Sequence, residues 1–115
     1  MGILNRIKDS FNAADFDVKG QTKVKTLKKH FTKEFGCTLR VYYGKRFAND
    51  DYTLAKIRND DNPGSSEEFK VRATWTVKEV EQKFMDSFGV KVQVANGTDT
   101  ELAPNSSSLG DVSRQ

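Results

Sequence analysis

The chain has 115 residues, the usual length of one domain, so a single hydrophobic core is expected. Hydrophobic residues make up 36% of the chain and charged residues 30%, a balance that is typical of a folded protein and excludes a wholly disordered one. No run approaches the roughly 18 apolar residues of a membrane span, and no apolar stretch resembles a secretory signal, so a cytoplasmic location is expected.

Residues 1–14 are predicted to form an amphipathic helix that precedes the domain. Its apolar side chains fall on one side: Ile3, Leu4, Ile7 and Phe11. We expect this helix to pack on the domain and cover an apolar surface. A membrane partner is not expected, because the segment has only two basic residues and no tryptophan.

The next segments predict a strand, a helix and a second strand. Residues 16–18 form the short first strand. Residues 24–35 repeat apolar side chains at three- and four-residue spacing, which predicts a helix that Gly36 ends. Residues 37–43 alternate apolar and polar side chains, which predicts a strand with one buried face. The chain is then expected to turn and to form a brief helical turn within 51–57.

The second half has the same order of elements. Residues 59–66 are a linker by composition, since they are rich in residues that favour turns. Residues 68–75 alternate and predict a strand. Thr76, with a glutamate three residues later, has the spacing of a capping box before a helix at 77–88. A further strand is expected at 90–95.

The two halves repeat one pattern at an offset of 53 residues, as VKTLKKHFTKEFG and VKEVEQKFMDSFG show. At this offset the matching apolar positions are Phe16 with Phe69, Val18 with Val71, Leu39 with Val92 and Val41 with Val94. With two residues inserted in the second half, Leu54 then matches Leu109 and Ile57 matches Val112. We interpret the chain as a tandem duplication of a β-α-β unit, with repeats at 15–58 and 67–113. Two such units are too few for an open repeat array, so they are expected to form one α+β domain over 15–113.

The order strand, helix, strand, strand, helix, strand predicts a two-layer α+β sandwich of the ferredoxin-like βαββαβ kind. A local resemblance gives an alternative. The segment RVYYGKRFANDDYTLAKI, residues 40–57, resembles ubiquitin-like proteins, in which a strand, a Gly-Lys turn and an Asp-x-Thr-Leu step lead into a short helical turn. This resemblance implies β-grasp-like units as the alternative fold. Conjugation chemistry is not expected, because the sequence ends in VSRQ and not in two glycines.

Side chains that could perform catalysis are sparse. His30 is the only histidine and is expected at the surface, and the single Cys37 excludes an internal disulfide and is expected in the core. Glycines do not form a phosphate-binding motif, and the acidic pairs at 50–51 and 60–61 lack the spacing of a calcium loop. We therefore expect a protein that is not an enzyme and that has no metal or other cofactor.

Charge is distributed unevenly along the chain. Residues 1–58 carry 13 basic and 6 acidic side chains, a net +7, whereas residues 59–115 carry a net −4. Much of the excess lies on the first helix, away from its apolar stripe: Lys25, Lys28, Lys29 and Lys33. Such an array is often only a solvated helix face. The functional interpretation is a basic contact surface.

Two binding hypotheses follow from this charge. The first is a protein-interaction module whose basic helix face meets an acidic protein surface, with weak self-association between oppositely charged halves as a variant. The alternative is a nucleic-acid-binding domain that uses the basic helix, or a sheet face with Arg40 and Tyr42. Protein interaction ranks first, because LRVYYGKRF has aromatic residues but not the order found in RNA-binding sheets.

Overall fold

The structure is a computed structural model that describes residues 16–60 and 63–113. Its elements are β1 (Phe16–Val18), α2 (Val24–Phe35), β2 (Thr38–Tyr43), β3 (Arg46–Phe47), α3 (Leu54–Ile57), β4 (Phe69–Val71), α4 (Val77–Phe88), β5 (Val92–Ala95) and α5 (Leu109–Val112). The helix predicted for residues 1–14, with Ile3, Leu4, Ile7 and Phe11, lies outside the described residues.

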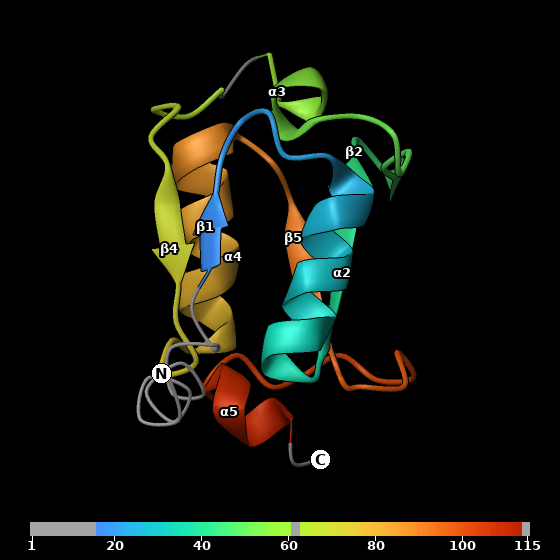
Figure 1. The fold of residues 1–115 in the computed structure, drawn as a ribbon, viewed down its shortest axis with the longest axis vertical. Coiled ribbons are helices and arrows are strands. Elements are labelled where there is room, and N and C mark those ends of the chain that lie inside the picture. Colours follow the sequence, from blue (N-terminus) through green and yellow to red (C-terminus); the bar gives the residue numbers. More distant parts are fainter. Residues whose placement is uncertain (1–15, 61–62, 114–115) are drawn as a thin grey trace, which may run out of the picture.

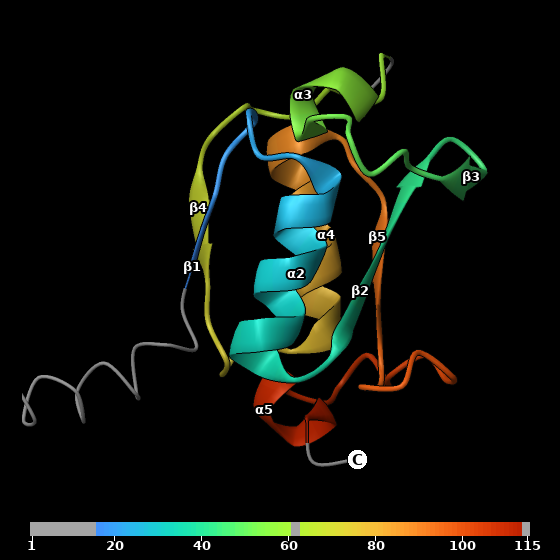
Figure 2. The ribbon, with the colours of Figure 1, turned by 45° about the vertical axis from the view of Figure 1, so that its right-hand side comes forward.

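Two small antiparallel sheets lie on opposite sides of a pair of helices. One sheet contains β1 and β4, and the other has the order β3-β2-β5. Figure 2 shows α2 and α4 between the sheets, and Figures 1 and 2 both show the two helices running in opposite directions, with α3 and α5 at the two ends. The helices are therefore covered by strands on two sides, and their apolar stripes are buried.

The predicted ferredoxin-like sandwich is wrong about the sheet. That fold places all its strands in one sheet, whereas β1 and β2 belong to different sheets here. Alternating side chains identify the buried face of a strand but not the strand beside it. In a ferredoxin-like sheet β1 and β4 would be central, and with three residues each they are too short to pair with all six residues of β2.

One strand is shorter than its alternating pattern predicts, and the structure has two short elements that the pattern does not predict. Residues 68–75 were predicted as one strand, but β4 ends at Val71, and a turn closed by the Trp75 N–H donating to the Arg72 C=O follows it. Strand β3 and helix α5 were not predicted. β3 has only two residues, which pair back with the end of β2. α5 has four residues and is held by a distant segment, since the Leu109 N–H donates to the Trp75 C=O.

Backbone hydrogen bonds in the first half recur in the second half. The matching donor and acceptor pairs are Val24 to Tyr52 with Val77 to Ser107, Leu54 to Thr22 with Leu109 to Trp75, and Ala48 to Val41 with Ala103 to Val94; all six lie between 2.8 and 3.0 Å. Donors and acceptors in each match differ by 53 or 55 residues, the offsets of the sequence pattern. The β1–β4 and β2–β5 registers are also symmetric, about Asp17–Lys70 and Arg40–Gln93.

One hydrophobic core joins both halves. Its buried side chains include matching residues at the two offsets: Val18 and Val71, Val24 and Val77, Leu27 and Val80, Phe31 and Phe84, Phe35 and Phe88, Cys37 and Val90, Leu39 and Val92, Val41 and Val94, Leu54 and Leu109, and Ile57 and Val112. Phe69 of β4 lies against Phe84 and Phe88 of α4, with ring centroids 5.1 and 5.8 Å apart. The apolar positions that the sequence repeats are therefore the positions that the fold buries.

Cys37 is buried, as predicted, and burial raises the pKa of its thiol from 9.0 to about 12. The folded protein thus keeps a proton that the unfolded chain loses as the pH rises above 9.0. The contribution of the Cys37 thiol to the free energy of unfolding is therefore fully present below that pH. We expect this contribution to fall by about 1.4 kcal/mol per pH unit between pH 9.0 and about 12.

Urea unfolding of the wild type and of Cys37→Val, below and above pH 9.0, tests this expectation. Valine is the matched substitution, because Val90 occupies the corresponding buried position. The variant should lose less stability with rising pH than the wild type. Equal pH slopes for the two proteins would show that the thiol titrates alike in both states.

Candidate functional site: a basic groove between α2 and β2

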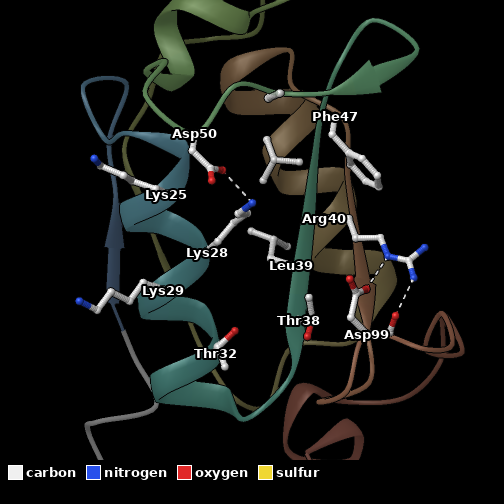
Figure 3. A pocket seen from close by; sticks show the side chains of 12 residues that line it. Lys25, Lys28, Lys29, Thr32, Thr38, Leu39, Arg40, Phe47, Asp50 and Asp99 are labelled. Atoms are coloured by element: carbon white, nitrogen blue, oxygen red, sulfur yellow. Dashed lines mark hydrogen bonds and ion pairs between the residues drawn. The ribbon is translucent and has the colours of Figure 1, made fainter.

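A groove of about 700 Å³ lies between helix α2 and strand β2 (Figure 3). Three lysines of the helix line one side of it, and consecutive residues of the strand line the other: Lys25, Lys28, Lys29, Leu39, Arg40 and Val41. Figure 3 shows Lys28 extending into the groove toward β2, whereas the ends of Lys25 and Lys29 extend away from β2. The strand directs Leu39 and Val41 to the core and Arg40 outward, as its alternating burial requires.

The lysine side of the groove is only partly neutralised. The Nζ of Lys28 lies 2.8 Å from Asp50 Oδ1, and the Nζ of Lys25 lies 3.1 Å from Asp51 Oδ1. Lys29 makes no ion pair with any residue in the described ranges. Exposed pairs of this kind contribute less than about 1 kcal/mol, so an incoming carboxylate can exchange with them at little cost.

Arg40 is held in place on the other side of the groove. Its Nε donates to Asp99 Oδ1 at 2.7 Å, and its Nη2 donates to the Asp99 carbonyl at 3.4 Å (Figure 3). The hydrogen bond to Asp99 raises the pKa of the guanidinium, and partial desolvation opposes this. The charge of Arg40 is therefore fixed at the outer side of β2.

The edge of β2 nearest the groove is buried, since Leu39 and Val41 are only 1% and 2% exposed as whole residues. The Tyr42 N–H donates to the Lys91 C=O of the neighbouring chain segment, so alternate backbone groups, those of Leu39 and Val41, face the opposite edge. The Val41 C=O accepts from the Ala48 N–H at 2.9 Å. Within the described part of the chain, the Leu39 N–H and C=O and the Val41 N–H have no hydrogen-bond partner at this edge.

This edge of β2 has no neighbouring strand at Leu39 because the chain leaves the sheet after Ala48. The Asp50 C=O accepts from the Lys25 N–H at 3.0 Å, and the Tyr52 C=O accepts from the Val24 N–H at 2.8 Å. The segment after β3 therefore satisfies the first turn of α2 and does not continue along β2. The cap residue Lys23 makes no side-chain hydrogen bond of its own, so these backbone bonds serve that end of the helix.

The second half has a corresponding groove of about 410 Å³ between α4 and β5. Glu81 and Gln82 stand there in place of Lys28 and Lys29. Burial raises the pKa of Glu81, whereas a hydrogen bond with the Val94 backbone and the charge of Lys91 oppose that shift. In the second groove the Glu81 carboxylate thus accepts a hydrogen bond from the backbone of Val94.

The outer face of the β3-β2-β5 sheet carries an aromatic pair. The Tyr42 and Phe47 rings are stacked with centroids 5.2 Å apart, and Phe47 is 68% exposed. The Nζ of Lys91 lies 5.3 Å from the centroid of the Tyr42 ring, and the Tyr42 hydroxyl donates to Gln93 at 2.6 Å. This face therefore combines exposed aromatic area with positive charge.

The fold brings four of the six predicted binding residues together at the groove: Lys25, Lys28, Lys29 and Arg40. Lys33 is exposed on α2 but does not line the groove, and Tyr42 lies on the outer sheet face. Sequence reasoning missed the unpaired strand edge at Leu39 and the exposed ring of Phe47. An alternating strand pattern contains no signal for either, because both depend on which strands pair.

No helix in residues 16–60 and 63–113 has the length and apolar character needed to cross a membrane. In the same ranges, no three His, Cys, Asp or Glu side chains gather as a metal-binding cluster. Comparison of the chain with protein-family models, with curated proteins and with solved structures gives no match.

Proposed function

We propose that this protein is a non-enzymatic interaction module that binds an acidic protein surface through the basic groove of α2 and β2. The observation that carries the proposal is the difference between two corresponding grooves. The first presents Lys28 and Lys29, and the second presents Glu81 and Gln82 at the same positions. Clustered positive charge beside a groove steers an acidic partner and fixes its orientation.

A reversal of charge on α2 tests this function. Changing Lys25, Lys28, Lys29 and Lys33 to glutamate is expected to preserve the fold, because the buried stripe of α2 contains none of them. The variant should fail to recover the partners that the wild type recovers in a pull-down at low salt. Far-ultraviolet circular dichroism checks that the helices remain.

The matched control is the double reversal Lys78→Glu and Lys83→Glu on α4, which leaves the first groove unchanged. This control should recover the same partners as the wild type. If the α2 variant also recovered them with the same salt sensitivity, the lysines would be only a solvated helix face, and the proposed function would be wrong.

Nucleic-acid binding is the second candidate, and the stacked Tyr42 and Phe47 beside Lys91 favour it. Aromatic rings next to positive charge are a common platform for unpaired bases. Titration with a random single-stranded oligonucleotide across a salt series distinguishes the two functions. Nucleic-acid binding should weaken log-linearly with salt and should decrease in Phe47→Ala, whereas an absence of binding at low salt removes this candidate.

We also propose that the two halves arose by tandem duplication of a β-α-β unit. The recurring hydrogen bonds and the symmetric registers support this origin. The order β2, Gly44 turn, β3 and α3 follows the order of the ubiquitin-like resemblance, which supports β-grasp-like units as the repeated element. If so, the difference between the two grooves arose after the duplication, as their side chains diverged on a shared backbone.

A further inference from the structure

We propose that two copies of this chain associate through the outer faces of their β3-β2-β5 sheets, with Phe47 of each protomer packed against Leu102 of the partner subunit. This inference goes beyond the proposed function, because it concerns the sheet face and not the lysines of α2. It assigns a partner to the apolar side chains that the fold leaves exposed on this face.

The first argument is the exposure of two large apolar side chains. Phe47 is 68% exposed and Leu102 is 50% exposed, and among the other large hydrophobic residues of 16–60 and 63–113 only Tyr43 is comparable. Figure 2 shows α2 and α4 against the inner side of the β3-β2-β5 sheet, and no helix of the described chain over its outer side. Exposed apolar side chains on an uncovered sheet face are typical of a protein-binding surface.

Strand pairing places both side chains on the outer face. Phe47 pairs with Tyr42 of β2, and the two rings are stacked. Leu102 forms a bridge with Ala95 of β5. Paired residues point to the same side of a sheet, and Tyr42 and Ala95 each follow a core valine of their own strand, so they point outward. Phe47 and Leu102 are therefore anchors on one face.

The second argument is that Phe47 and Leu102 are equivalent positions of the two halves. They differ by 55 residues, as do their neighbours Ala48 and Ala103, whose N–H groups donate to matching carbonyls of β2 and β5 at 2.9 Å. Because the β2–β5 register is symmetric, the two anchors lie at opposite corners of the face. A two-fold dimer can therefore bring each Phe47 onto the Leu102 of the other copy, and both contacts form together.

The third argument is that the two corners carry opposite charge. The charged residues are Lys45, Arg46 and Lys91 near Phe47, and Asp99 and Glu101 near Leu102. Apart from Asp99, which pairs with Arg40, none of them makes an ion pair within the described ranges. Stacking opposite corners places the basic corner of one copy on the acidic corner of the other. A nucleic acid lying across the whole face would instead meet the carboxylates, so the charges favour a second copy.

Sedimentation equilibrium of the full chain at several concentrations tests the association. The wild type should pass from monomer to dimer as its concentration rises, and added salt should weaken the dimer by screening the charges. Phe47→Glu and Leu102→Lys should each weaken it by at least about tenfold, the equivalent of about 1.4 kcal/mol. Tyr43→Ser is the matched control and should dimerise as the wild type does, because Tyr43 is 47% exposed but follows Tyr42 and so points to the other side of the sheet. Circular dichroism checks that each variant is folded.

Mixing the two weakened variants tests the pairing of the anchors. When Phe47→Glu meets Leu102→Lys, one of the two contacts joins opposite charges and the other is the native contact of Phe47 with Leu102. The mixture should therefore dimerise at concentrations at which each variant alone is monomeric. If the mixture associated no better than its components, the proposed pairing would be wrong.

Other results would assign the face differently. A wild type that stays monomeric at every concentration overturns the proposal. Binding of a random single-stranded oligonucleotide that Phe47→Glu abolishes and Tyr43→Ser retains would then make the face a nucleic-acid surface. A dimer that survives both Phe47→Glu and Leu102→Lys would have its interface elsewhere, which also overturns the proposal. The test of the proposed function stays separate, because none of these variants changes α2.

Discussion

Phe31→Ala and Phe84→Ala are each expected to lower the free energy of unfolding by about 3–5 kcal/mol. Both rings are fully buried, and each belongs to the buried stripe of its helix. A loss of this size is a large share of the ~5–15 kcal/mol that stabilises a typical domain. Either substitution should therefore unfold, or nearly unfold, the whole chain.

The fluorescence of Trp75 shows whether the two halves unfold together in urea. Trp75 is the only tryptophan, it belongs to the second half, and its ring stacks on Phe69 at 6.1 Å. If the core is one cooperative unit, Phe31→Ala shifts the urea transition seen by tryptophan fluorescence as far as the transition seen by circular dichroism. A fluorescence transition that did not move would show that the second half unfolds independently.

Phe47→Ala is the matched control for both core substitutions. It removes the same side chain from a position that is 68% exposed, so it leaves no cavity. We expect its effect on the free energy of unfolding to stay within about 0.5 kcal/mol, as for most surface substitutions. The same control separates stability from binding, because Phe47 also lies beside the proposed site.

The helices were predictable from the sequence because their signals are local. The spacing of apolar residues and the glycines at their ends predicted residues 24–35 and 77–88, which are the bounds of α2 and α4. Gly36 and Gly89 have φ of 68° and 62°, the left-handed backbone in which a glycine ends a helix without strain. These features need only a few neighbouring residues to be recognised.

The sheets were not predictable in the same way, because pairing depends on distant segments. The alternation in residues 37–43 predicted the buried face of β2 but gave no information on its neighbours, β3 and β5. The candidate site shows the same division. The lysines of α2 were predicted from their spacing on a helix, whereas the unpaired edge of β2 beside them depends on where the chain leaves the sheet after Ala48.

The segment at residues 59–66 was predicted only as a linker, but its described part is bound to α4. The Ser65 N–H donates to the Asp86 C=O at 2.9 Å, and the Ser66 N–H donates to the Ser87 C=O at 2.7 Å. Gly64 precedes them with φ of 77°, and a Cβ at this position would lie 2.6 Å from the carbonyl carbon of Ser87. The close approach of two backbones therefore requires glycine here.

Gly64→Ala is expected to destabilise the fold by clearly more than Gly44→Ala. Gly44 has a similar φ of 66°, but a Cβ there would have nothing within 4 Å. Alanine at Gly44 thus costs only the left-handed backbone, about 1–2 kcal/mol. Alanine at Gly64 adds an overlap with the backbone of α4, which neither segment can relieve without breaking the bonds of Ser65 and Ser66.

Urea unfolding of both glycine variants measures the difference, and amide exchange of Ser65 and Ser66 locates it. Faster exchange of these two amides in Gly64→Ala, and not in Gly44→Ala, would show that the segment has separated from α4. Equal stabilities with unchanged exchange would mean that the close approach is easily relieved. Because β4 follows this segment and pairs with β1, its attachment to α4 helps to set the position of the whole β1–β4 sheet.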